Sequence, residues 1–386
     1  MDETIVSTSL QAFSVFASKL LEGNEGVFFS EKQGNQERWI FGWGKKRNVD
    51  FAQGPFPFFS LTSFKGDMKY FWYFENTLSS IECAELENKE FPQVLNNIIG
   101  ELTFDLAQCS NETEESFVAK AKRVRHAAEN GDVWVLNLAH QLSGKMENET
   151  VLLSLFYRFL KLQKDHCGGV VFTNEQKMCS MSPEIFLHQK GQTLSTFPIK
   201  GTGTLSYLKE NKKEISELAM VTDLLRNDLG QIAQRVWVEK ERVLVNRGDF
   251  WDAHSEVFAS LGPQADLTWE MYRKLLPAGS ISGAPKKRVM EYISELESFE
   301  RGFYTGTFGV KFSPTESIFN ILIRTLFLNS SQPSPQPSPK GGGRKKEGGS
   351  LWEFPVGAGI TYESDPRAEW KETFQKAEIL KKVSRI

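Results

Sequence analysis

Short runs of aromatic and β-branched residues constrain the fold of this chain most strongly. They occur at residues 27–29 (VFF), 39–43 (WIFGW) and 69–74 (KYFWYF), and glycine or asparagine separates them. Short runs that are wholly apolar or alternate with polar residues predict core strands. With 386 residues, of which 12% are aromatic, the chain can bury a large core in one big domain or two. We therefore expect a strand-rich region over residues 1–100, with its aromatic side chains packed in the core.

The charge balance bears on the class of partner. Lysine and arginine number 46 against 49 aspartate and glutamate, a net charge of -3 that gives no reason to expect nucleic acid or an anionic membrane as partner. Four scattered cysteines without a C-x-x-C pair indicate neither a disulfide framework nor a zinc site. Asp2 and Glu3 stand where a signal peptide would carry basic residues. No run of about 18 apolar residues, the length that predicts a transmembrane helix, occurs in the sequence. We expect a soluble protein of the cytoplasm.

A single lysine interrupts an apolar run at residues 196–204 (TFPIKGTGT). Lys200 follows Ile199 and precedes Gly201 and Gly203, which let a ligand approach the backbone closely. An amine withdrawn from water loses its proton more readily and becomes a usable nucleophile. The alternative is an ordinary lysine at a strand end that reaches into water.

A carboxylate lies upstream of that lysine in apolar surroundings. Glu184 is 200 − 184 = 16 residues before Lys200 and is followed by Ile185 and Phe186. A carboxyl group among such neighbours can keep its proton near neutral pH and act as a general acid. An exposed glutamate at a strand end is the alternative.

Two predicted helices carry further carboxylates. On the helix predicted over residues 209–234, Glu217 shares a face with apolar residues and therefore needs a partner. A hard divalent cation is one candidate, and a salt bridge to Arg226 or Lys213 is the other. The last predicted helix begins at Pro366, and one of its faces carries two carboxylates and an amine: Glu369, Glu372 and Lys376.

Six motifs follow one another along the second half of the chain. They are residues 217–228 (ELAMVTDLLRND), 277–286 (PAGSISGAPK), 301–306 (RGFYTG), 323–325 (IRT), 357–366 (GAGITYESDP) and 369–373 (EWKET). This ordered series resembles the chorismate-utilising enzymes, which include the large subunits of anthranilate synthase and aminodeoxychorismate synthase and the isochorismate and salicylate synthases. The resemblance covers about residue 131 to the end of the sequence, apart from one insertion.

The resemblance implies an α+β fold: two large, mostly antiparallel β-sheets packed as a sandwich with helices outside, as in component I of anthranilate synthase. It divides the chain into a variable N-terminal region, residues 1–100, and a chorismate-binding catalytic region, residues 101–386. Residues 330–350 stand where relatives have a tight turn. Their Pro, Ser, Gly and Lys composition predicts a disordered insertion.

The resemblance also implies roles for individual residues. Lys200 and Glu184 would be catalytic, and Mg²⁺ would be held by Glu217 and Glu372 with Glu369 nearby. The implied substrate-binding residues are Thr202, His254, Ser280, Tyr304, Arg324, Gly357, Gly359 and Lys376. At the position that contacts the substrate ring, the spacing leaves His254 and Ser255 both open.

Two positions distinguish the branches of this family. Relatives that add water to chorismate carry a lysine as general base where this chain has Val135, which cannot abstract a proton. Anthranilate synthases typically carry alanine at the position of Lys200, whereas aminodeoxychorismate synthases carry lysine. The expected reaction is therefore chorismate plus ammonia to 4-amino-4-deoxychorismate, on the way to para-aminobenzoate and folate. Ammonia would come from glutamine through a separate amidotransferase subunit. Component I of anthranilate synthase and a chorismate-binding protein without turnover are the alternatives.

Overall fold

The structure, a computed structural model, describes residues 8–34, 36–80, 104–163, 165–246, 251–263, 266–329 and 350–385. The predicted region boundary near residue 100 lies outside the described residues, as do residues 330–349 of the predicted insertion. Both therefore stay predictions. Among the helices of the described part, none is long and apolar enough to cross a membrane.

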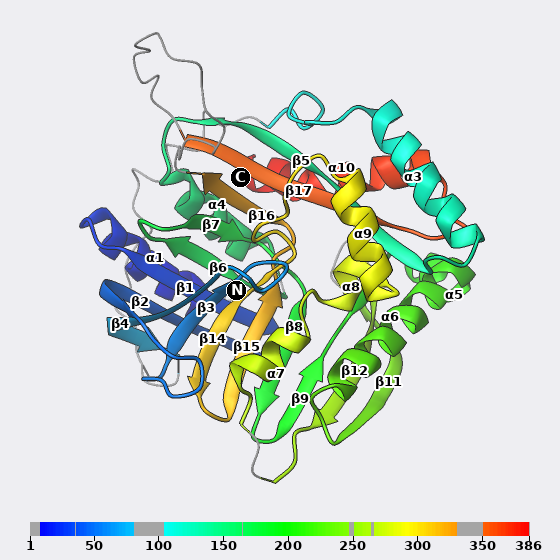
Figure 1. Cartoon of the computed structure of the whole chain (residues 1–386). Helices are drawn as coiled ribbons and strands as arrows, with labels where there is room; N and C mark the ends of the chain where they lie inside the picture. Colours follow the sequence, from blue (N-terminus) through cyan, green and yellow to red (C-terminus); the bar gives the residue numbers. More distant parts are fainter. Residues whose placement is uncertain are drawn as a thin grey trace, which may run out of the picture.

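In the described ranges, seventeen strands join into one antiparallel hydrogen-bonded network, which runs through two halves (Figure 1). In order of pairing, the first half consists of β13 (Gly283–Ala284), β5 (Val135–Met146), β17 (Ser350–Ile360), β16 (Thr325–Asn329), β7 (Lys177–Ser180), β6 (His166–Phe172), β1 (Gly26–Gln33) and β2 (Gln36–Asn48). The second half begins with β4 (Lys69–Ser79), β3 (Phe58–Thr62), β14 (Thr307–Ser313), β15 (Glu316–Ile321), β8 (Ile185–Lys190) and β9 (Thr193–Thr196). It ends at β12 (Trp251–Ser260), which pairs with β9, with β10 (Ile199–Gly203) and with β11 (Arg235–Asn246).

The two halves pack against each other through a shared apolar core. Phe29 of β1 meets Phe308 of β14 with ring centroids 5.5 Å apart. Asn320 of β15 donates from Nδ2 to the Cys167 carbonyl of β6 at 2.7 Å, so this buried amide is paired across the interface. The predicted α+β fold with packed antiparallel sheets is thus confirmed. Because β2 also pairs with β4, the two sheets are continuous with each other.

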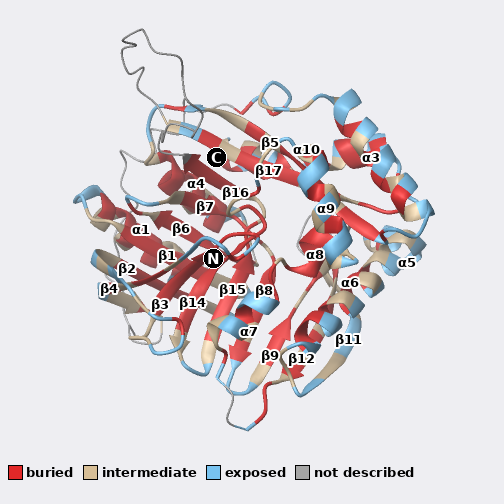
Figure 2. Cartoon of the chain, in the orientation of Figure 1, coloured by how far each residue is buried: buried red, intermediate tan, exposed pale blue. Residues whose placement is uncertain are grey.

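Helices cover the outer faces, and Figure 2 shows their inner sides buried and their outer sides exposed. They are α1 (Thr8–Leu21), α3 (Glu114–Glu129), α4 (Val151–Leu162), α5 (Leu205–Glu210), α6 (Lys212–Gly230), α7 (Trp269–Lys274), α8 (Gly279–Ser282), α9 (Lys286–Leu296) and α10 (Pro366–Ser384). The helix α10 starts where the sequence predicted, because the Asp365 carboxylate accepts hydrogen bonds from the backbone N–H groups of Arg367 and Ala368, each at 2.8 Å.

The sequence predicts strands over residues 301–310 and 318–328 that pair as a hairpin carrying Tyr304 and Arg324, and β14 and β15 form that hairpin. The structure places both residues beyond the strand ends, in irregular segments. Arg324 has φ 49° and Thr305 has φ 59°, in the left-handed region that residues with a Cβ rarely adopt. Such backbone is concentrated at functional sites, where the surroundings hold it in place.

Candidate active site

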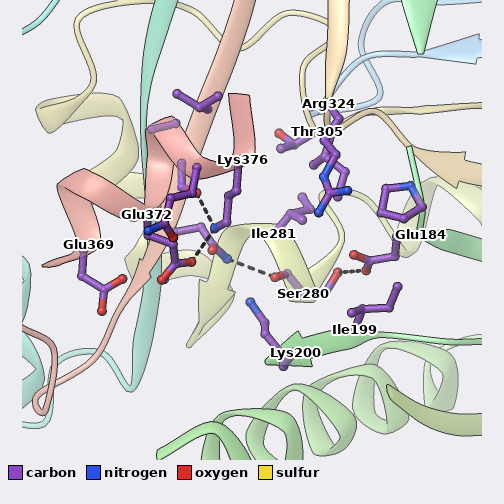
Figure 3. A pocket seen from close by; sticks show the side chains of 18 of the residues that line it. Glu184, Ile199, Lys200, Ser280, Ile281, Thr305, Arg324, Glu369, Glu372 and Lys376 are labelled. Carbon is purple, nitrogen blue, oxygen red and sulfur yellow. Dashed lines mark hydrogen bonds and ion pairs between the residues drawn. The ribbon is translucent and has the colours of Figure 1, made fainter. Parts of the chain in front are cut away.

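A cavity of about 410 Å³ lies where α6, α8 and α10 meet β5, β10 and β17. Most of the predicted site residues line it: Glu184, Lys200, Glu217, Ser280, Tyr304, Arg324, Gly357, Gly359, Glu369, Glu372 and Lys376. In Figure 3 the carboxylates of α10 lie on one side and Glu184 on the other, with Lys200 and Ser280 between them. Residues from positions 184 to 376 therefore converge on one enclosed space.

His254 and Ser255 were the two alternatives for the ring-contacting position, and neither is among the residues that line the cavity. Side chains alternate along β12. The Ser255 hydroxyl faces α6 and lies 2.6 Å from the Thr222 hydroxyl, whereas the His254 ring lies against Phe197 with centroids 6.4 Å apart. For Thr202, only its place in the backbone of β10 is described.

Glu184 directly precedes β8 and is buried, with 6% of its surface exposed. The Ser280 hydroxyl of α8 donates to its Oε1 at 3.3 Å. Burial raises the pKa of Glu184 to about 7, although the positive charges of Lys200 and Arg324 act in the opposite direction. The carboxyl group thus holds its proton close to neutral pH, as a general acid must.

Lys200 lies on β10, where the pairing with β12 is irregular between Ile199 and Thr202. The neighbouring Gly201 has φ 81°, which favours glycine. If Gly359 of β17 carried a Cβ atom, that atom would lie 4.0 Å from Lys200 Nζ and 3.6 Å from Val135 Cγ2. The amine therefore lies close to the backbone of β17, on the side where Val135 offers only a hydrocarbon surface.

Carboxylates of α6 and α10 face each other across the cavity mouth. Lys213 Nζ donates to Glu369 Oε1 at 2.8 Å and lies 3.5 Å from Glu217 Oε1. On the neighbouring turn, Lys376 Nζ lies 2.9 Å from Glu372 Oε1 and donates to the Gly357 carbonyl at 2.7 Å. Of the two salt bridges considered for Glu217, the one to Lys213 is present in the structure.

The pKa values of these carboxylates reflect their crowding. Burial raises the pKa of Glu217, and the charges of Glu214 and Glu372 add to the rise while Lys200 and Lys213 oppose it. Burial, together with the charge of Glu372, also raises the pKa of Glu369. Burial acts to raise the pKa of Glu372 too, but the hydrogen bond and charge of Lys376, together with the charges of Lys200 and Lys213, lower that pKa overall. A bound cation would lower the raised pKa values of Glu217 and Glu369, because positive charge favours the ionised form of a carboxyl group.

A magnesium site was predicted at these residues, and its donors can be compared with what the ion requires. Within the described ranges, no three His, Cys, Asp or Glu side chains converge as closely as a cage of protein ligands would need. Mg²⁺ commonly takes only one or two carboxylates and keeps several waters. Glu217 and Glu372 can supply that pair, and Glu217 Oε1 is buried without a hydrogen-bond donor. The donor set therefore fits a partly hydrated Mg²⁺.

One buried ion pair behind the cavity was not singled out from the sequence. Arg301 donates from Nη2 to Glu297 Oε1 at 2.7 Å and to the Asn137 carbonyl at 2.6 Å, and from Nη1 to the Ile281 carbonyl at 3.0 Å. Glu297 Oε1 in turn accepts from the Ala139 N–H at 2.9 Å. These bonds fix β5 against α8, the helix that carries Ser280. Arg301 opens the motif at residues 301–306, but only its contacts reveal this role.

Comparison with known proteins gives a consistent result. The model of a family described as chorismate binding enzyme matches residues 51–382. Anthranilate synthase component 1 of Lactococcus lactis subsp. lactis (strain IL1403) is 29% identical over 330 residues, which cover 80% of this chain and 66% of the relative. Aminodeoxychorismate synthase component 1 of Bacillus subtilis (strain 168) is 28% identical over 278 residues, 69% of this chain and 54% of the relative. The chain thus spans about half to two thirds of the length of these curated relatives.

A solved structure shows the same fold. Anthranilate synthase component I from Streptococcus pneumoniae TIGR4 superposes with a TM-score of 0.62 at 21% sequence identity, covering 92% of this chain and 91% of that one. At this identity the likeness concerns the fold alone. It agrees with the large antiparallel sheet and the outer helices described above.

Proposed function

Because the chain belongs to the family of chorismate binding enzymes, we propose that it is component I of an aminodeoxychorismate synthase. Its reaction would convert chorismate and ammonia to 4-amino-4-deoxychorismate. The observation that carries this choice is the placement of Lys200, whose side chain lines the same cavity as Glu184, the carboxyl group with its pKa raised to about 7. A glutamine amidotransferase as a separate ammonia-supplying subunit and a cytoplasmic location are part of the proposal.

The cavity walls suggest how the substrate would be held. Arg324 carries a fixed planar charge and suits a bidentate contact with the enolpyruvyl carboxylate, next to Tyr304 and the backbone of Gly357 and Gly359. Lys376 adds a second positive charge on the α10 side. A bound Mg²⁺, held by Glu217 and Glu372 and completed by water, would neutralise the ring carboxylate.

The chemistry would use one nucleophile and one acid. The lone pair of the Lys200 amine attacks C2 of the ring, the double bonds shift, and the C4 oxygen leaves as water with the proton that Glu184 donates. Nζ is then joined to C2. Ammonia adds at C4, the bond between C2 and Nζ breaks to return the amine, and the new C4 ammonium gives a proton back to the Glu184 carboxylate. Water has no base at Val135 to activate it, which favours ammonia as the external nucleophile.

Component I of an anthranilate synthase is a second candidate, since the Lactococcus relative carries that name. A product assay separates the two. Purified protein is incubated with chorismate, Mg²⁺ and an ammonium salt, and the products are separated by chromatography. We expect 4-amino-4-deoxychorismate. Anthranilate and pyruvate as main products would favour the second candidate, and unchanged chorismate would indicate a protein that binds without turnover.

The proposed metal leads to a prediction for two glutamates. Glu217→Gln and Glu372→Gln should each lower Mg²⁺-dependent turnover by about a hundredfold or more, because each removes one charge from a hard-cation site. Turnover is measured over a Mg²⁺ titration, and circular dichroism checks the fold. Glu378→Gln, at an exposed position of the same helix as Glu372, is the matched control and should behave as the wild type. Full activity of the wild type in EDTA would contradict the metal proposal.

A further inference from the structure

Lys213 has no part in the proposed chemistry, yet it occupies the centre of the carboxylate group. It lies in the first turn of α6, one turn before Glu217, and only about a third of its side chain is exposed. Its ammonium is 2.8 Å from Glu369 Oε1 and 3.5 Å from Glu217 Oε1. The contact with Glu217 does not meet hydrogen-bond geometry, because Glu217 Oε1 remains without a donor. Lys213 therefore satisfies Glu369 directly and Glu217 only by its charge.

This ammonium joins the two helices that supply the proposed cation ligands. Glu217 and its neighbour Glu214 come from α6, whereas Glu369 and Glu372 come from α10. A divalent cation held at Glu217 and Glu372 would draw on the same negative charge that now surrounds Lys213. Two positive groups a few ångströms apart in a partly buried site repel each other strongly. Glu217 is the carboxylate that both would share, so a bound cation should displace the ammonium from Glu217.

We infer that the Lys213 ammonium stands in for the divalent cation in the metal-free protein and competes with it for the carboxylates of α6 and α10. The inference rests on the proposed Mg²⁺ of this site. Lys213 holds α6 to α10 when no metal is present, and it must move away from Glu217 when the metal binds. Competition of this kind lowers the affinity for the metal. By the same coupling, binding of the metal should release the Lys213 ammonium and make it more exposed to solvent.

The first test measures affinity without turnover. Mn²⁺, as a probe for Mg²⁺, is titrated into the intact wild-type chain and into Lys213→Met, and binding is followed by calorimetry. We expect Lys213→Met to bind Mn²⁺ about tenfold more tightly. Lys212→Met removes the same charge from the exposed neighbouring position, where screening is strong, and should change affinity by no more than about twofold. Equal or weaker binding by Lys213→Met than by the wild type overturns the inference.

The second test uses the wild type, so it does not depend on how well a variant folds. The protein is treated briefly with acetic anhydride with and without saturating Mg²⁺, and acetylation of Lys213 and Lys212 is compared by peptide mass spectrometry. We expect Mg²⁺ to raise labelling of Lys213 severalfold relative to Lys212. Constant or reduced labelling of Lys213 overturns the inference even where Mn²⁺ binds. If neither the wild type nor Lys213→Met binds Mn²⁺, the proposed metal itself is wrong, and this inference falls with it.

Discussion

Lys200→Ala is expected to lower the rate of 4-amino-4-deoxychorismate formation by about a thousandfold or more, because it removes the proposed covalent nucleophile. The same variant opens C2 of the ring to ammonia, since alanine stands at this position in the anthranilate-forming branch. A small amount of anthranilate and pyruvate should therefore appear. The products of wild type and variant are compared by chromatography with saturating ammonium.

Lys209→Ala is the matched control for that substitution. Lys209 is an exposed residue of α5, a short distance along the chain, and it does not line the cavity. Its rate should stay within about twofold of the wild type, as surface substitutions usually do. A Lys200→Ala variant that retains the wild-type rate and product would show that the amine is not the nucleophile.

The covalent step can also be observed directly. When the wild type is given chorismate without ammonia, no nucleophile is present to add at C4 and release the ring from Lys200, so the adduct should accumulate. Peptide mass spectrometry should then show Lys200 carrying the chorismate ring less one water. Lys376 is a useful internal reference, because it lines the same cavity but is paired with Glu372 and the Gly357 carbonyl. An adduct on Lys376 alone would contradict the assignment.

The sequence predicts where individual helices and strands lie better than it predicts which of them pack against each other. The helix α10 follows from an Asp-Pro start and a three- and seven-residue spacing, which place Glu369, Glu372 and Lys376 on one face. Spacing within one helix says nothing about which helix lies opposite. The contact between Lys213 and Glu369 joins residues 156 positions apart. Only the fold, or a resemblance to proteins of known fold, brings α6 and α10 together.

Local irregularities mark the other limits of sequence-based prediction. Tyr304 and Arg324 were expected in regular strands, but β14 begins at Thr307 and β15 ends at Ile321, so both residues lie outside them. The positive φ of Arg324 is imposed by surrounding contacts, including the hydrogen bond from the Met181 N–H to its carbonyl at 3.0 Å. Apolar and polar residues alternate around His254 as they do elsewhere in β12, so the pattern could not show that the cavity lies elsewhere.

Glu184→Gln is expected to lower turnover by a factor of about a hundred to ten thousand, because the amide cannot donate a proton to the departing C4 oxygen. The variant keeps the shape of the side chain and can still accept the hydrogen bond of the Ser280 hydroxyl. Glu378→Gln, exposed on α10, is again the control that makes the same chemical change outside the cavity.

The pH dependence gives a sharper test of Glu184, because its sign follows from burial. The acid form is the active one and the pKa is raised to about 7, so the ratio of wild-type turnover to that of Glu184→Gln, which cancels the contribution of the shared Lys200 amine, should be level below pH 7 and fall about tenfold per pH unit above it. Glu184→Gln has no proton to lose there, and its residual rate should not show this fall.

Stability should change over the same pH range. A raised pKa in the folded protein means that Glu184 contributes stability below its unfolded pKa and loses that contribution as the pH rises through about 7. A rise from 4.5 to about 7 corresponds to about 3 kcal/mol. Between pH 5 and 8, the melting temperature of the wild type should therefore fall relative to that of Glu184→Gln. If the two proteins keep the same difference in melting temperature across this range, Glu184 does not titrate between pH 5 and 8, and the raised pKa of about 7 on which its role as the acid rests is wrong.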